Sequence, residues 1–266
     1  MQRLDGKVAV ITGGAGGIGL ALGRRFQQAG MRIALADVEP AALDAAVAAL
    51  GGGDDVLGVV CDVTDVDDVH RLRDAVLARF GAAHVVCANA GVAPSGPVIG
   101  TSIASWRWVM DVNVMGVIHT IDAFGPTLVA QGDGHFVLTA SVAGLSTTPG
   151  LGAYSATKHA VVGTAATLRA ELAGSGVSAS ALCPGLVNTR IFESERNRPD
   201  DAESHVDPGT ADLFRGIIGG GADPAQVADA VHDAVLADDM FIFPTNDVLD
   251  MVRTRLDQVA EALPDA

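Results

Sequence analysis

A lone tyrosine and a nearby lysine are the residues of this sequence whose types and spacing most directly suggest chemistry. Tyr154 is the only tyrosine among 266 residues, and Lys158 follows it by four positions. In a helix that spacing places both side chains on one face. Two unit charges about 5 Å apart interact by roughly 3 kcal/mol at an effective dielectric of about 20, so we expect the ammonium to lower the pKa of the phenol from about 10 to about 8. The pair therefore predicts a proton-transfer group.

Two more polar residues stand where they can assist such a group. Ser141 follows an apolar run, residues 134–140, and its hydroxyl can hold a reacting oxygen, although a helix-capping or turn serine is an open alternative. Asn113 lies inside an apolar helical stretch, where its amide needs a partner such as water leading outward from Lys158. Ser141 does not stand in a GxSxG sequence, which disfavours a serine hydrolase.

A glycine-rich turn, residues 12–19 (TGGAGGIG), follows the first apolar run of the chain. The amides and dipole of a helix N-terminus at this place can hold a pyrophosphate. We expect Gly13 to permit the tight turn, Gly17 to let the backbone approach the phosphates, and Gly19 to let the helix pack close to the sheet. A plain flexible turn is the alternative. The expected contacts are Gly13, Gly16, Gly17, Ile18 and Gly19.

Further candidates for binding a dinucleotide follow the next three apolar runs. Asp37 can accept hydrogen bonds from the adenosine ribose, which favours NAD because no Arg or Lys nearby would neutralise a 2′-phosphate. Helix capping is the alternative for Asp37 and for Asp62, whose side chain can otherwise reach adenine. Small residues after the fourth run let the chain pass beside the cofactor. The residues at these positions are Asp62, Val63, Asn89, Ala90 and Gly91.

Short β-branched runs alternate with longer helical patterns, which is typical of βαβ units. We predict an α/β fold, a Rossmann-like doubly wound parallel sheet of about seven strands with helices on both faces. The predicted strands are residues 7–12, 32–36, 56–61, 84–88, 134–140, 177–183 and 240–243. The predicted helices are residues 16–29, 40–50, 65–79, 102–130, 154–173 and 224–237, followed by a final amphipathic helix. We expect a single domain over residues 1–266 and a lid-like insertion at about 188–221, where periodicity fails.

Composition excludes several classes of function. The formal net charge of −15 repels phosphate backbones and anionic lipid, so we expect neither nucleic acid nor membrane as a partner. No signal-peptide pattern precedes the first strand, and no apolar run approaches the ~18 residues of a membrane span. The three cysteines are expected to be reduced core thiols of a cytoplasmic protein. Histidine spacing gives no metal site.

Taken together, these motifs resemble the single-domain branch of the short-chain dehydrogenase/reductase superfamily. The resemblance implies that Asn113, Ser141, Tyr154 and Lys158 form a catalytic tetrad and that Lys158 also binds the nicotinamide ribose. It implies further that residues 184–189 line the nicotinamide, through Pro184, Gly185, Val187 and Thr189. Ala88 departs from the usual asparagine of the family. A homotetramer is likewise an expectation from the resemblance.

The function expected from these features is NAD(H)-dependent interconversion of a secondary alcohol and a ketone, with Tyr154 as general acid and base. Ile191 and Phe192 open the lid with apolar bulk, which favours a mainly apolar small-molecule substrate. Anchoring of the loop is the alternative for these two residues, and Arg190 leaves open a carboxylate-bearing substrate. The rival functions are a non-catalytic dinucleotide sensor and an isomerase or dehydratase that holds NAD tightly.

Overall fold

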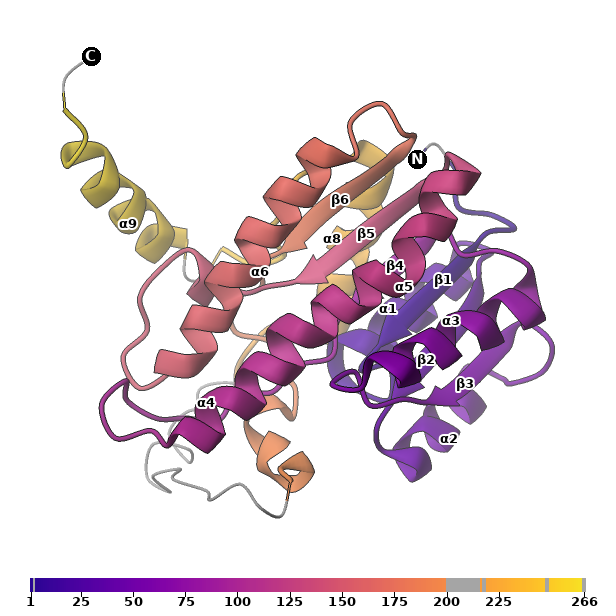
Figure 1. Cartoon of the computed structure of the whole chain (residues 1–266), viewed down its shortest axis with the longest axis horizontal. Helices are drawn as coiled ribbons and strands as arrows, with labels where there is room; N and C mark the ends of the chain where they lie inside the picture. Colours follow the sequence, from indigo (N-terminus) through magenta and orange to yellow (C-terminus); the bar gives the residue numbers. More distant parts are fainter. Residues whose placement is uncertain (2, 200–215, 217–218, 247–248, 265–266) are drawn as a thin grey trace.

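Seven parallel strands form one sheet in the order β3-β2-β1-β4-β5-β6-β7 (Figure 1). This computed structural model describes all residues except 2, 200–215, 217–218, 247–248 and 265–266. Each predicted strand agrees with an observed one to within about one residue at either end, and the predicted fold is confirmed. The strands are β1 (Val8–Thr12), β2 (Arg32–Asp37), β3 (Val56–Val60), β4 (Val85–Ala88), β5 (Gly134–Thr139), β6 (Val177–Leu182) and β7 (Phe241–Ile242).

Helices cover both faces of the sheet, and each face has its own apolar core. On one face lie α1 (Gly17–Gln28), α2 (Pro40–Ala49) and α8 (Pro224–Ala237). On the other lie α3 (Val66–Phe80), α5 (Gly116–Gln131) and α6 (Gly152–Glu171). The central strands β1, β4 and β5 are buried along their whole length, which explains why most of their residues are apolar.

The strand order reverses beside β1, because β2 and β4 lie on either side of it. In a doubly wound sheet this reversal opens a crevice at the carboxyl ends of the strands, where ligands bind. The glycine turn after β1, Asn89 after β4 and Ser141 after β5 all come out at this edge. The topology therefore gathers the predicted site residues from distant parts of the sequence.

The helix predicted over residues 102–130 is interrupted by a π-helical turn. It consists of α4 (Ile103–Met110), the π-helical segment Asp111–Met115 and α5. The helix from Ile103 to Gln131 is long and apolar enough to cross a membrane, with a mean hydropathy of 1.2 over its best window, although the sequence analysis found no such run. One such helix is weak support for a span, because core helices pass the same test. This helix also packs against α3 and α6.

The first part of the predicted lid follows β6 and forms a short 3₁₀ helix, Ile191–Asn197. The rest of that prediction falls largely on residues 200–215 and 217–218, which lie outside the described residues. The final helix, α9 (Leu249–Glu261), extends away from the sheet (Figure 1). Its Met251 still lines the main cavity described below.

Candidate active site

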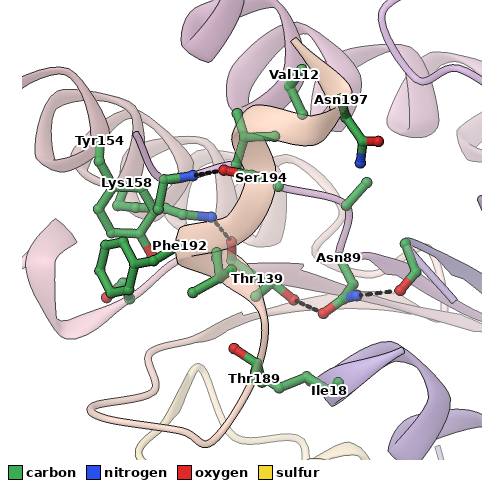
Figure 2. A pocket seen from close by; sticks show the side chains of 18 of the residues that line it. Ile18, Asn89, Val112, Thr139, Tyr154, Lys158, Thr189, Phe192, Ser194 and Asn197 are labelled. Atoms are coloured by element: carbon green, nitrogen blue, oxygen red, sulfur yellow. Dashed lines mark hydrogen bonds between the residues drawn. The ribbon is translucent and has the colours of Figure 1, made fainter. Parts of the chain in front are cut away.

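A cavity of about 780 Å³ opens at the carboxyl edge of the sheet. Its volume lies within the usual range for small-molecule and cofactor sites. Of the predicted site residues, all but Gly19 and Asn113 line it. Figure 2 shows Tyr154, Lys158 and Phe192 on one side of this pocket and Asn89 on the other. The cavity thus brings the predicted proton-transfer group and the predicted dinucleotide-binding turn together.

Tyr154 and Lys158 both lie on α6, as their spacing predicts. The Lys158 ammonium is 5.4 Å from the centre of the Tyr154 ring, and its Nζ donates a hydrogen bond of 2.7 Å to the carbonyl of Thr139. That carbonyl is the last one of β5. Lys158 is only 2% exposed, so the strand end fixes the position of its charge.

The predicted direction of the Tyr154 pKa shift is wrong. Burial raises the pKa of Tyr154 to about 12, although a hydrogen bond with Ser141 acts in the opposite direction. Burial also lowers the pKa of Lys158 to about 8. Removal of water disfavours both charged forms, and this cost exceeds the attraction that the sequence spacing suggested. The phenol therefore keeps its proton in the free protein.

Ser141 caps a short helix, as one of its two sequence interpretations expected, and it also faces the cavity. Its Oγ accepts a hydrogen bond of 3.1 Å from the amide of Ala143 and so caps the short 3₁₀ helix Val142–Gly144. The same oxygen lies 3.4 Å from the carbonyl of Pro184, to which it donates. The side chain also lines the cavity. Capping thus holds the hydroxyl beside Tyr154.

Asn113 is bonded differently from the prediction. Its Oδ1 accepts from the amide of Val92 at 2.8 Å, and its Nδ2 donates to the carbonyl of Val92 at 2.9 Å and to Thr157 Oγ1 at 3.1 Å. The amide is fully buried, and both of its polar atoms have protein partners. A Cβ added to Gly91 would lie 3.3 Å from Asn113 Oδ1 and 3.6 Å from Lys158 Nζ, so Gly91 separates the two side chains.

The glycine turn is held by Asn89, a contact that the sequence analysis missed. Asn89 Nδ2 donates to the carbonyls of Thr12 at 3.0 Å and Gly13 at 3.3 Å, and its Oδ1 accepts from Thr139 Oγ1 at 3.2 Å. Gly13 has a φ of 63°, and a Cβ there would lie 2.8 Å from the Cα of Ala90. Asn89 therefore ties β1, β4 and β5 together at the turn. The threonines that end β1 and β5, Thr12 and Thr139, were the sequence feature that could have indicated this contact.

Asp37 and Asp62 do not cap the helices that follow them. Asp37 accepts from the amides of Ala15 at 2.9 Å and Glu39 at 3.1 Å, whereas the N-cap of α2 is Glu39 itself. Asp62 accepts from the amide and hydroxyl of Thr64, and Asp65 caps α3. Both carboxylates line the cavity.

The residues present fit a dinucleotide. The glycine turn leads into the N-terminus of α1, which offers free backbone amides to a pyrophosphate. A carboxylate at the end of β2 stands where a ribose would lie in this fold. A Cβ on Gly17 would lie 3.1 Å from Thr189 Cγ2, so the turn and the segment after β6 form one close cradle. Among the described residues no group of three or more His, Cys, Asp or Glu could hold a metal ion.

The sheet, the glycine turn and the half-buried tyrosine together define a dinucleotide-binding fold with a tyrosine–lysine pair at its crevice. A family model described as short chain dehydrogenase matches residues 7–200. The chain belongs to this short-chain dehydrogenase family.

Curated relatives and solved structures agree with this assignment. The chain is 37% identical over 253 residues to 1-deoxy-11-beta-hydroxypentalenate dehydrogenase of Streptomyces avermitilis, covering 92% of this chain and 87% of the relative. It is 36% identical over 190 residues to D-threitol dehydrogenase of Mycolicibacterium smegmatis, covering 71% and 73%. A short-chain dehydrogenase/reductase from Burkholderia phymatum, solved in complex with NAD, superimposes with a TM-score of 0.94 at 36% identity, with both chains fully covered.

Proposed function

We propose that this protein is an NAD(H)-dependent dehydrogenase that interconverts a secondary alcohol and a ketone, with Tyr154 as its general acid and base. The observation that carries the proposal is one cavity that Tyr154, Lys158 and Ser141 share with the glycine turn and Asp37. The family membership and the NAD complex of the Burkholderia phymatum structure support it. The test is NADH formation by the purified protein from NAD and a panel of secondary alcohols. No NADH with any of them would refute it.

NAD, when bound, supplies the hydride acceptor of alcohol oxidation, and the protein supplies the proton chemistry. In ketone reduction the protonated Tyr154 hydroxyl donates its proton to the carbonyl oxygen, while Ser141 donates a hydrogen bond that orients the same oxygen. In alcohol oxidation Tyr154 must first lose its proton, which the Lys158 ammonium favours by charge proximity. Asn113 positions Val92 and Thr157 behind this group through the bonds described above.

Preference for NAD over NADP is proposed from the carboxylate of Asp37, which would repel a 2′-phosphate. The adjoining Val38 is neutral and lines the same cavity. We expect kcat/KM with NAD to exceed that with NADP, and the double variant Asp37→Ala, Val38→Arg to shrink or reverse the ratio. A wild-type preference for NADP would contradict this assignment.

A mainly apolar substrate is proposed from the lining of the cavity. Apolar side chains from separate segments face it, among them Trp108, Leu151, Leu186 and Phe192. The names of the relatives include a pentalenate and threitol, so family membership alone does not select the substrate. Arg190 lies at the glycine turn, because its guanidinium is 3.9 Å from where a Cβ on Gly16 would be. This placement favours a phosphate partner for Arg190 over a substrate carboxylate.

A cytoplasmic homotetramer is the proposed state of the protein. Exposed apolar residues on the long helix, Met110, Met115 and Ile118, offer a surface for association. The three cysteines are free and buried, which suits a reducing compartment. Light scattering on the purified protein measures the assembly, and a monomer at micromolar concentration would contradict it.

A further inference from the structure

The segment of residues 190–198, which we call the strap, crosses the main cavity and is fastened to the body on the substrate side. Ser194 is 4% exposed, and its Oγ accepts a hydrogen bond of 3.1 Å from the amide of Ala93. The guanidinium of Arg198 lies 4.3 Å from the ring centre of Trp108 and donates to Ser105 Oγ at 3.1 Å. Figure 2 shows the strap running from Phe192 past Ser194 to Asn197. These contacts fix one side of the strap beside α4.

The strap is also fastened on the adenosine side, by a single carboxylate oxygen. Glu39 Oε1 accepts hydrogen bonds from Arg196 Nε at 3.0 Å, Arg196 Nη2 at 2.7 Å and Asn197 Nδ2 at 3.1 Å. Arg196 accordingly lowers the pKa of the Glu39 carboxyl. Glu39 stands at the N-cap of α2, two residues after Asp37. The contact therefore joins the strap to the edge of the sheet proposed to hold the ribose.

Groups on both sides of this contact line the same cavity, including Asp37, Glu39, Arg196 and Asn197. The glycine turn lines this cavity too, and the strap brings the Arg190 guanidinium close to it, 3.9 Å from where a Cβ on Gly16 would be. The Arg190 side chain is exposed, and its charge also lowers the pKa of the Glu39 carboxyl. A dinucleotide that extends from Asp37 to Tyr154 would thus lie beneath the strap, with a guanidinium facing its pyrophosphate.

We propose that Glu39 is the latch that holds the strap beside the bound dinucleotide, so that breaking the contact of Glu39 with Arg196 and Asn197 speeds the release of the cofactor. The inference rests on the proposed use of NAD. Glu39 is a positioning residue, because it acts through Arg196 and Asn197 and not on reacting atoms. The latch is partly solvent-exposed, at 27% for Glu39 and 36% for Arg196. Such ion pairs are weak, so the latch sets a rate and does not block exchange.

The experiment follows NADH release by stopped-flow fluorescence in the wild-type protein, in Glu39→Ala and in the control Asp44→Ala. Asp44 carries the same charge on α2 and is exposed. We expect Glu39→Ala to release NADH about five-fold faster, because truncation of a contact acts mainly on the dissociation rate. The control should match the wild type. Hydrogen exchange of residues 191–198 in the free protein should also accelerate in Glu39→Ala alone.

A charge reversal separates a latch from a general loss of structure. Glu39→Arg and Arg196→Glu should each speed NADH release, and the double variant should return toward the wild-type rate. Equal release rates in the wild type and Glu39→Ala, or equal acceleration in Asp44→Ala, would overturn the latch. Wild-type protein that binds no NADH would overturn the cofactor assignment along with it, and the two failures are thereby distinguishable.

Discussion

Strands β5 and β6 carry two polar clusters, and only one of them opens into a cavity. Past their carboxyl ends, Ser141 and Pro184 meet Tyr154 and Lys158 at the main cavity. A few residues earlier in the same strands, His135 Nε2 lies 2.7 Å from Ser180 Oγ, and His135 Nδ1 lies 3.9 Å from Asp238 Oδ1. The second cluster thus has the residue types of a serine hydrolase, whereas the first does not.

The two clusters differ in their access to the main cavity. His135 and Ser180 are both 0% exposed, and neither lines the main cavity. Ser180 Oγ donates to the carbonyl of Asp239, so His135 Nε2 must donate to Ser180, and Nδ1 is left without a hydrogen-bond partner. That arrangement gives the serine no base to remove its proton. The cluster joins β5 and β6 to the chain before β7, and its contribution is to stability.

The largest expected effect separates the two clusters by activity. Tyr154→Phe keeps the aromatic ring but removes the hydroxyl that exchanges a proton, so we expect kcat to fall about a thousand-fold while NADH affinity stays within a few-fold. Steady-state kinetics and fluorescence titration of NADH measure these two quantities. Comparable activity in the variant would remove Tyr154 from the mechanism.

The second effect concerns stability in acid and arises in the buried cluster of His135 and Ser180. Burial lowers the pKa of His135 from 6.5 to about 4, so the unfolded chain binds an additional proton between these pH values. The free energy of unfolding should therefore fall by about 3 kcal/mol as the pH drops from 6.5 to 4. Above pH 6.5 the contribution of neutral His135 to stability is fully present. Urea denaturation across this range measures the slope.

Because carboxylates titrate in the same interval, the relevant quantity is the difference from His135→Gln, which keeps a polar side chain without the titration. The variant should lose less stability on acidification than the wild type. If the unfolding free energies of the two proteins changed in parallel with pH, the cost of protonating His135 would be small. The buried cluster of His135 and Ser180 would then accept a charge at little cost.

Two serine substitutions should give smaller effects, one on stability and the other on kcat. Ser180→Ala leaves His135 Nε2 without its partner, which we expect to cost about 1–3 kcal/mol of stability with kcat nearly unchanged. Ser141→Ala should instead lower kcat with a smaller loss of stability, since Ala143 and Pro184 keep their backbone positions. Thermal denaturation measures the stability of both variants, and steady-state kinetics measures their kcat. If both variants lost stability and kcat to the same extent, the distinction between the two clusters would be wrong.

Sequence alone predicted the sheet well because strand burial has a direct signature. Runs such as residues 8–12 are apolar or β-branched and end at turn-forming residues, so their bounds can be read locally. The cavity lining was predicted for the same reason, since glycine and small residues directly follow strands. Local pattern and topology together therefore brought most of the predicted site residues to one cavity.

Features that depend on packing between distant segments were not predicted. The spacing of Tyr154 and Lys158 reveals a charge pair but not the exclusion of water that dominates both pKa values. Asn113, in the π-helical turn, bonds to Val92, 21 residues away, and to Thr157. Glu39 and Arg196 are 157 residues apart, and neither belongs to a motif. Each of these contacts arises only when the fold brings the segments together.

The smallest expected effect tests what the open cavity recognises. If apolar burial drives recognition, each methylene added to the alkyl substituent of a secondary alcohol should improve kcat/KM by up to about 0.8 kcal/mol, until the pocket is full. Phe192 is half-buried, lines the cavity and lies beside Tyr154 and Lys158 in Figure 2, so Phe192→Ala should flatten this trend. A homologous series of alcohols assayed with both proteins gives the two slopes.

If small charged hydroxy acids outperform every apolar alcohol, and Arg190→Ala abolishes their advantage, then the pocket binds acids and Arg190 faces the substrate. If the apolar series gains with length and Arg190→Ala changes only the affinity for NADH, then Arg190 serves the cofactor.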